Sequence, residues 1–190
     1  MNAAGDTHGS GAGPFAPARE MRRCPGCRVE LPVTDWPGGT TKYNASPECA
    51  EVAGELVGFE LQHLAELGRL HQLRIDAYAA QHVGPQSPAI GAVFALNGLY
   101  MYLERGSGNL DVRTAHGIMA NSHSDWPPLT PPDRVADLTA HAVLRAGTIE
   151  GVGKQMIDWA DQVWNSWPDR DQQLIRDLTV ALVPPRYFGR

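Results

Sequence analysis

The chain has 190 residues and a formal net charge of −5; 43% of its residues are hydrophobic and 19% are charged. This length and composition suffice for one domain with a buried core. No cluster of lysine and arginine stands out, so the composition does not indicate nucleic acid as a partner. The longest apolar stretch, 89–103, is interrupted by Asn97 and glycines and is shorter than the ~20 residues of a membrane-spanning helix, so no membrane association is expected.

Residues 1–20 are rich in glycine, alanine, proline and serine and lack the hydrophobic segment of a secretory signal. Because such a segment cannot bury enough surface to offset its ordering entropy, we expect a disordered tail. We expect one helical domain over 21–190, which includes a cysteine-bearing lobe at 21–49. Three cysteines without an export signal favour reduced thiols and a cytoplasmic location over a disulfide framework.

All three cysteines lie within the first 49 residues. Cys24 and Cys27 flank Pro25-Gly26, and this Cys-x-x-Cys turn puts both sulfurs on one side of a tight loop, as in a zinc knuckle. The proline- and glycine-rich stretch 22–43 is expected to form this knuckle followed by a loose hairpin or irregular loop. A redox dithiol is the competing interpretation, but such pairs usually accompany a βαβ pattern, which this sequence lacks.

The third cysteine stands at the predicted start of a helix. Ser46 is a good N-cap, Pro47 suits the first helical position, and Glu48 favours the positive end of the helix dipole. Cys49 then lies in the first turn of a helix that runs at least to Phe59. The three sulfurs therefore predict a shared Zn²⁺ ion, which needs a fourth ligand or a water molecule.

Helical spacing of apolar residues predicts further helices along the rest of the chain. They cover 70–82, 89–104, 110–120, 134–145, 153–166 and 170–182. The stretch 89–104 is apolar nearly all round, as is typical of a helix at the centre of a bundle. The predicted fold class is therefore all-α: a bundle of about six helices with a small, irregular zinc-knuckle lobe at the N-terminus.

Two histidines compete to be the fourth ligand. His71 and His82 share one helix face but lie ~16 Å apart along its axis, so they cannot both bind one ion. A turn near Gln62 would bring His71 towards Cys49, whereas a turn at Gly68 would bring His82 nearest. The sequence slightly favours His71 and keeps His82 as the alternative. Either histidine could instead be a hydrogen-bonded core residue.

Three segments carry a family resemblance. They read C-P-G-C at 24–27, Y-x-x-S-x-x-C at 43–49 and H-x-L-x-x-D-x-Y-x-x-Q-H at 71–82. In combination they resemble a bacterial family of small proteins of unknown function, over about residues 22–180. The resemblance implies no activity. It implies a shared signature that consists of Cys24, Cys27, Cys49, His71, Asp76, Tyr78, Gln81 and His82.

The chain departs from this family pattern at two positions. Val83 stands where the pattern has proline after the histidine, and Ala95 lies near a position where the family often has a histidine. If that histidine were an essential ligand in the family, this chain would lack it.

The leading functional interpretation is a zinc-binding protein of unknown biological role, in which the metal is mainly structural. The first alternative is a hydrolase-like zinc enzyme with water at an open fourth position and Asp76 or His82 as general base. A second alternative is a regulatory or partner-binding module that uses the N-terminal tail and the proline-rich loop 126–132. The sequence does not decide whether the protein is an enzyme, and it names no substrate or partner.

Overall fold

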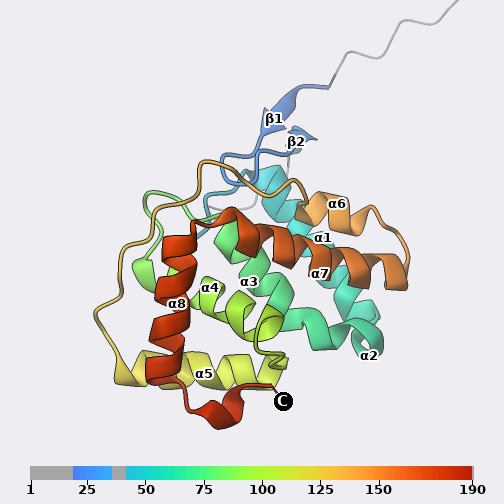
Figure 1. Cartoon of the computed structure of the whole chain (residues 1–190). Coiled ribbons are helices and arrows are strands. Elements are labelled where there is room, and N and C mark those ends of the chain that lie inside the picture. The colour runs from blue at the N-terminus through green and yellow to red at the C-terminus, as the bar shows by residue number, and fades with distance from the viewer. Residues whose placement is uncertain (1–18, 36–41, 190) are drawn as a thin grey trace, which may run out of the picture.

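The computed structural model describes residues 19–35 and 42–189. The predicted tail at 1–20 lies almost entirely outside these residues, so it and the proposed domain limits stay predictions. The described elements, shown in Figure 1, are β1 Met21–Arg23, β2 Glu30–Pro32, α1 Pro47–Gln62, α2 Leu64–Leu67, η1 Gly68–Leu70, α3 His71–Gln81, α4 Ala89–Leu103, α5 Asn109–Ser122, α6 Ala140–Leu144, α7 Ile149–Ser166, α8 Asp169–Leu182 and η2 Pro185–Tyr187. Apart from the two short strands, the regular secondary structure of the described residues is helical, which confirms the all-α prediction.

Helix α4 forms the centre of the bundle, as its apolar sequence predicts (Figure 1). It packs against α3, α5, α7 and α8, and Leu96, Leu99 and Met101 are fully buried. Burial of each such side chain contributes about 2 kcal/mol. The polar exception, Asn97, donates from Nδ2 to Thr179 Oγ1 of α8 at 2.7 Å, while its Oδ1 has no partner among the described residues. Although α4 is so apolar, no helix in the described part of the chain is long and apolar enough to cross a membrane.

One predicted helix is much shorter than expected. The sequence predicts a helix over 134–145, but α6 begins only at Ala140, after Thr139, whose side chain accepts from Ala142 N. The preceding backbone is irregular because side chains from other helices bind it. Leu138 N donates to Gln162 Oε1 at 3.0 Å, and the Leu138 carbonyl accepts from Gln81 Nε2 at 2.8 Å.

The N-terminal strands form an antiparallel hairpin in which Arg22 pairs with Leu31. The knuckle lies between these strands, whereas the sequence-based expectation had the hairpin follow it. The chain closes the knuckle through Cys24 N, which donates to the Val29 carbonyl, and Arg28 N, which donates to the Cys24 carbonyl. Arg28 has a φ of 63°, in the left-handed region that a tight turn requires. Figure 1 shows this hairpin at the end of the bundle near α1.

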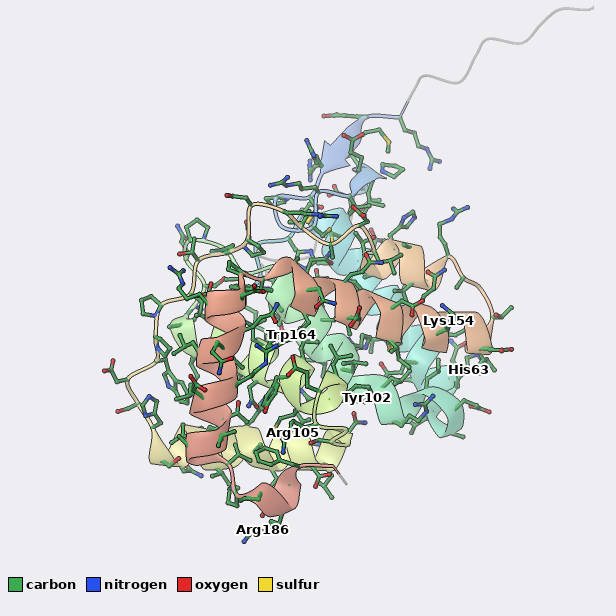
Figure 2. All side chains as sticks on the ribbon, in the orientation of Figure 1. His63, Tyr102, Arg105, Lys154, Trp164 and Arg186 are labelled. Atoms are coloured by element: carbon green, nitrogen blue, oxygen red, sulfur yellow. The ribbon has the colours of Figure 1, made fainter. Side chains whose placement is uncertain are left out.

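Helices α1 and α3 are joined by a corner that contains α2 and η1. At the far end of α1 from the hairpin, Glu60 contacts His71, and at the near end Cys49 contacts His82. Cys49 and Glu60 are eleven residues apart, as are His71 and His82. The two segments therefore run antiparallel in one fixed register. Figure 2 shows His63, another histidine of this region, at the corner itself.

Candidate metal centre

Four side chains that are distant in sequence meet below the hairpin. The ligand atoms of this cluster all lie within 4.8 Å of one another, and the residues are Cys24, Cys27, Cys49 and His82. The sulfurs of Cys27 and Cys49 are 3.7 Å apart, and Cys49 Sγ is 3.4 Å from His82 Nε2. None of the three cysteines is in a disulfide. This Cys₃His cluster could therefore hold a metal ion.

The cluster is almost completely shielded from solvent. The exposed fractions are 0% for Cys24, 3% for Cys27, 2% for Cys49 and 0% for His82. A group of three unpaired thiols and an imidazole at such depth is an unusual way to fill a core, because apolar side chains would do so without polar atoms to satisfy.

The knuckle fits against the rest of the cluster because Gly26 has no side chain. A Cβ atom at this position would lie 2.5 Å from the Asn44 carbonyl oxygen and 2.6 Å from His82 Cδ2. The segment before α1 is held on the same side, since Asn44 N donates to the His82 carbonyl at 2.9 Å. Pro25-Gly26 thus brings two sulfurs of the knuckle up to the imidazole.

Cys49 is positioned by the predicted helix start. Ser46 caps α1, and its side-chain oxygen accepts from Cys49 N at 3.2 Å. Glu48 is 2% exposed and pairs with Arg22 of β1 at 2.8 Å, which ties the hairpin to α1 beside the cluster. The cap prediction at Ser46, Pro47 and Cys49 is confirmed.

His82 directly follows the last residue of α3, and both nitrogens of its ring are engaged. Nδ1 lies 2.8 Å from the Tyr78 carbonyl, so in the neutral ring we assign the proton to Nδ1, which leaves the lone pair of Nε2 directed at the cysteines. The Tyr78 ring lies 4.1 Å from the His82 ring, and its hydroxyl donates to Cys49 Sγ at 3.9 Å. These contacts fix the orientation of the imidazole, as carbonyl partners commonly do for metal-binding histidines.

The electrostatics of the cluster favour negative sulfur and a nearby cation. Hydrogen bonds from Cys27 and Cys49 lower the pKa of the Cys24 thiol far below its usual range. Hydrogen bonds with Cys24 and Cys27, then burial, then the negative charge of those two neighbours raise the pKa of Cys49. Burial alone would lower the pKa of His82, but the neighbouring Cys24 and Cys27 raise it to about 9. Burial and the cysteine charges raise the pKa of Tyr78, which keeps its hydroxyl a donor.

His71, the slightly favoured fourth ligand in the sequence analysis, does not lie with the cysteines. Its Nδ1 is 2.6 Å from Glu60 Oε1, and its side chain is 40% exposed. Arg74 Nε binds the other oxygen of Glu60 at 2.5 Å. The position of the turn between α1 and α3 explains this difference. The turn consists of α2 and η1, and its centre lies between Gln62 and Gly68. In this register the alternative residue, His82, reaches the sulfurs.

Asp76, a candidate general base, also lies outside the cluster. It is 3% exposed, and its Oδ1 accepts from Gln72 Nε2 at 2.9 Å, while Oδ2 has no hydrogen-bond partner among the described residues. Burial raises the pKa of this carboxyl well above its usual value. It faces α4 at Gly98, where a Cβ atom would come within 1.9 Å of Oδ2. Of the two candidate general bases, only His82 lies in the cluster.

The sequence analysis named Gln81 only as part of a family signature. In the structure its side chain links α3 to α7 and to the backbone before α6. Its Oε1 accepts from Trp159 Nε1 of α7 at 3.0 Å, and its Nε2 donates to the Leu138 carbonyl. Gln81 thus fixes the end of α3 one residue before His82. Its place directly before the histidine in the third motif was the available signal.

The fold and the cluster together define an all-α protein with a buried Cys₃His group at one end. Comparison with known protein families matches residues 22–168 to a family of unknown function (DUF5946), and the chain belongs to this family. The matched range contains all four residues of the cluster. No curated protein and no solved structure matches the chain.

Proposed function

We propose that this chain is a zinc-binding protein whose metal ion is mainly structural. One Zn²⁺ would be held by Cys24, Cys27, Cys49 and His82, joining the N-terminal hairpin and the start of α1 to the end of α3. The observation that carries this proposal is the buried cluster itself, whose four ligand atoms lie within 4.8 Å of one another.

Two of the separations in the cluster agree with zinc, and the others are within 4.8 Å. With Zn–S near 2.3 Å and Zn–N near 2.0–2.1 Å, a tetrahedron has edges of about 3.8 Å between two sulfurs and about 3.5 Å between sulfur and nitrogen. The corresponding distances here are 3.7 Å between Cys27 and Cys49 and 3.4 Å between Cys49 and His82. Soft thiolate ligands with one imidazole select zinc over hard cations such as magnesium and calcium.

A structural role is favoured over catalysis because the protein supplies four ligands and shields them. Catalytic zinc sites usually have three protein ligands and one position open to water. Here the fourth corner is His82, which is 0% exposed and has its second nitrogen bound to the Tyr78 carbonyl. His82 is therefore not free to act as a general base, and Asp76 belongs to a different environment.

Zinc would also explain how three thiols are accommodated in a core. Metal binding needs deprotonated cysteines and a neutral histidine, so the ion offsets the negative charge that these residues would otherwise share. The requirement for reduced thiols supports the cytoplasmic location expected from the sequence. The bacterial origin implied by the family resemblance belongs to the same proposal.

The metal assignment is tested by elemental analysis of protein purified without added metal. We expect about one zinc per chain in the wild type, and substantially less in Cys27→Ser and His82→Asn. His71→Asn is the matched control: it removes the other candidate histidine and should keep the zinc. A chelator should lower the Tm of the wild type and have little effect on His82→Asn.

Two results would overturn the proposal. The first is a folded wild-type protein that contains no metal and has the same Tm with and without chelator. The second is zinc loss in His71→Asn with full zinc content in His82→Asn. Retention of zinc with an open coordination position, detected as a water ligand by X-ray absorption, would instead favour the enzymatic alternative.

A further inference from the structure

A second polar feature lies in a cavity separate from the cysteine cluster. The cavity has a volume of about 300 Å³ and is formed by α3, the first half of α4 and α5, with Lys42 and Tyr43 also in its wall. Its size is at the lower end of the usual range for small-molecule sites. Most of its lining is apolar and includes Ile75, Ile90 and Phe94.

Two residues that line the cavity each have a buried polar atom without a partner among the described residues: Asp76 Oδ2, which faces Gly98 of α4, and His116 Nε2. Asp76 is 3% exposed as a whole. Since more than nine in ten buried polar groups in proteins are hydrogen-bonded, two exceptions in one cavity wall require an explanation.

Asp76 Oδ2 is an acceptor in the ionised carboxylate, a form that burial disfavours and that a bound cation would favour again. Gln72 donates to the other oxygen of Asp76, and no basic side chain in the described residues forms an ion pair with this carboxyl. Burial lowers the pKa of His116 to about 4, so its ring is neutral at pH 7. The ring also has a backbone hydrogen bond with Phe94, which we assign to Nδ1 because Nε2 has no partner. Nε2 then presents a lone pair.

An apolar cavity with two buried acceptors matches a ligand that has an apolar body and a cationic group with several N–H donors. We propose that this cavity binds a small organic ammonium compound, whose N–H groups donate to Asp76 and His116 and whose hydrocarbon part packs against Ile90 and Phe94. An ammonium group supplies the missing counter-charge for the buried carboxylate and can donate more than one hydrogen bond. A neutral alcohol of the same length supplies neither a charge nor a second donor.

The cavity is close to the cysteine cluster but distinct from it. The Tyr43 ring packs edge-on against Tyr78 with ring centres 5.2 Å apart, and Tyr78 in turn lies against His82. These two aromatic rings separate the cavity from the sulfurs. Ligand binding in the cavity therefore does not depend on zinc binding, and the ammonium site and the zinc site can be tested separately.

Calorimetric titration of the full-length protein with hexylamine tests the proposal, with hexanol as the uncharged probe of equal length. We expect saturable binding of hexylamine at one site and at least about tenfold weaker binding of hexanol, since a hydrogen bond to a charged group contributes about 1.5–3 kcal/mol. Zinc content is measured on each sample so that loss of the metal is not mistaken for loss of the ligand.

Asp76→Asn should weaken hexylamine binding by about tenfold or more. Its Tm should stay equal to that of the wild type or rise, because the substitution removes a buried carboxyl that lacks a counter-charge. The matched control is Asp171→Asn. Asp171 is also 3% exposed and also has an unpartnered Oδ2, but it lies on α8 and does not line the cavity. This control should bind hexylamine like the wild type.

A second pair of variants tests the location. Gly91 is exposed and lines the cavity, and a Cβ atom there would have no neighbour within 4 Å, so Gly91→Leu should fold and place a larger side chain at the cavity opening. Gly58→Leu is the control, because Gly58 is equally open but lies on α1 outside the cavity. We expect hexylamine binding to be lost in the first and kept in the second. The proposal is overturned by absence of saturable binding, by equal affinity for hexanol, by unchanged binding in Asp76→Asn or Gly91→Leu, or by equal losses in the controls.

Discussion

Gly26 is the residue at which the knuckle depends most directly on the absence of a side chain. Its backbone φ is not in the left-handed region, so its conformation does not require glycine. The requirement comes from close approach, because a Cβ atom would overlap the Asn44 carbonyl and the His82 ring. The glycine in C-P-G-C thus serves the contact between the knuckle and His82.

We predict that Gly26→Ala weakens zinc binding and lowers stability. The added methyl group must displace either the Asn44 backbone or the imidazole, at a cost of about 1–3 kcal/mol, as for other overpacked sites. Thermal melts and competition with a chromogenic zinc chelator measure the two effects. Gly58→Ala is the control, since its Cβ would meet no atom within 4 Å. Wild-type zinc affinity in Gly26→Ala would contradict the packing argument.

At the scale of elements, the far end of the α1–α3 pair is held by a buried carboxylate. Glu60 is 0% exposed and binds His71 with one oxygen and Arg74 with the other. Arg74 is itself 7% exposed, so its guanidinium depends on this partner. The two helices are therefore joined at one end by an ion pair and at the other by the Cys₃His cluster.

Glu60→Gln should destabilise the protein by about 3 kcal/mol, because it leaves a buried guanidinium without its counter-charge. Zinc content should not change, since Glu60 lies ~16 Å along α1 from Cys49. Urea unfolding and elemental analysis on the same samples measure both quantities. As a control, Asp158→Asn breaks the exposed pair with Lys154 and should cost less than ~1 kcal/mol. Loss of zinc from Glu60→Gln would show that the two ends of the helix pair are coupled.

The sequence predicted the fold class and most helix starts because these depend on local signals. Ser46 and Pro47 mark the beginning of α1 independently of the rest of the chain. The apolar sequence of α4 favours a position at the centre of the bundle. The corner between α1 and α3 has no such signal. Gly68 follows the last residue of α2, but its backbone stays in the right-handed helical region, so the chain continues directly into η1. The choice between His71 and His82 was therefore decided by tertiary packing.

The environment of Asp76 was similarly inaccessible to local reasoning. A carboxylate between Ile75 and Ala77 on a helix with polar positions reads as a surface residue. It is buried because Gly98, on another helix, leaves space for its oxygen. The length of α6 has the same kind of cause, since Gln81 and Gln162 bind the backbone that local spacing predicted as helix.

For the whole molecule, the metal is expected to stabilise one end more than the rest. The cluster joins the hairpin, the start of α1 and the end of α3, whereas α4 and α7, which supply none of its four residues, carry fully buried side chains such as Leu96, Met156 and Trp159. We predict that zinc removal by chelation increases amide hydrogen exchange at 21–35, 42–50 and 79–83 and leaves α4 and α7 protected. Mass spectrometry of peptides measures this pattern. Equal deprotection of every helix would mean that the metal supports the entire bundle.

The antiparallel register of α1 and α3 also limits how the length of the chain can vary. Deleting or inserting one residue between Gln62 and His71 would turn every later position of α3 by about 100° around its axis. His82 would then lose its contact with the cysteine sulfurs, and Arg74 would lose its ion pair with Glu60. Such a length change could not be repaired by substituting one nearby residue, because two contacts at opposite ends of the helix would need new partners. The corner residues can thus vary in identity, but their number is tied to the distance between Cys49 and His82.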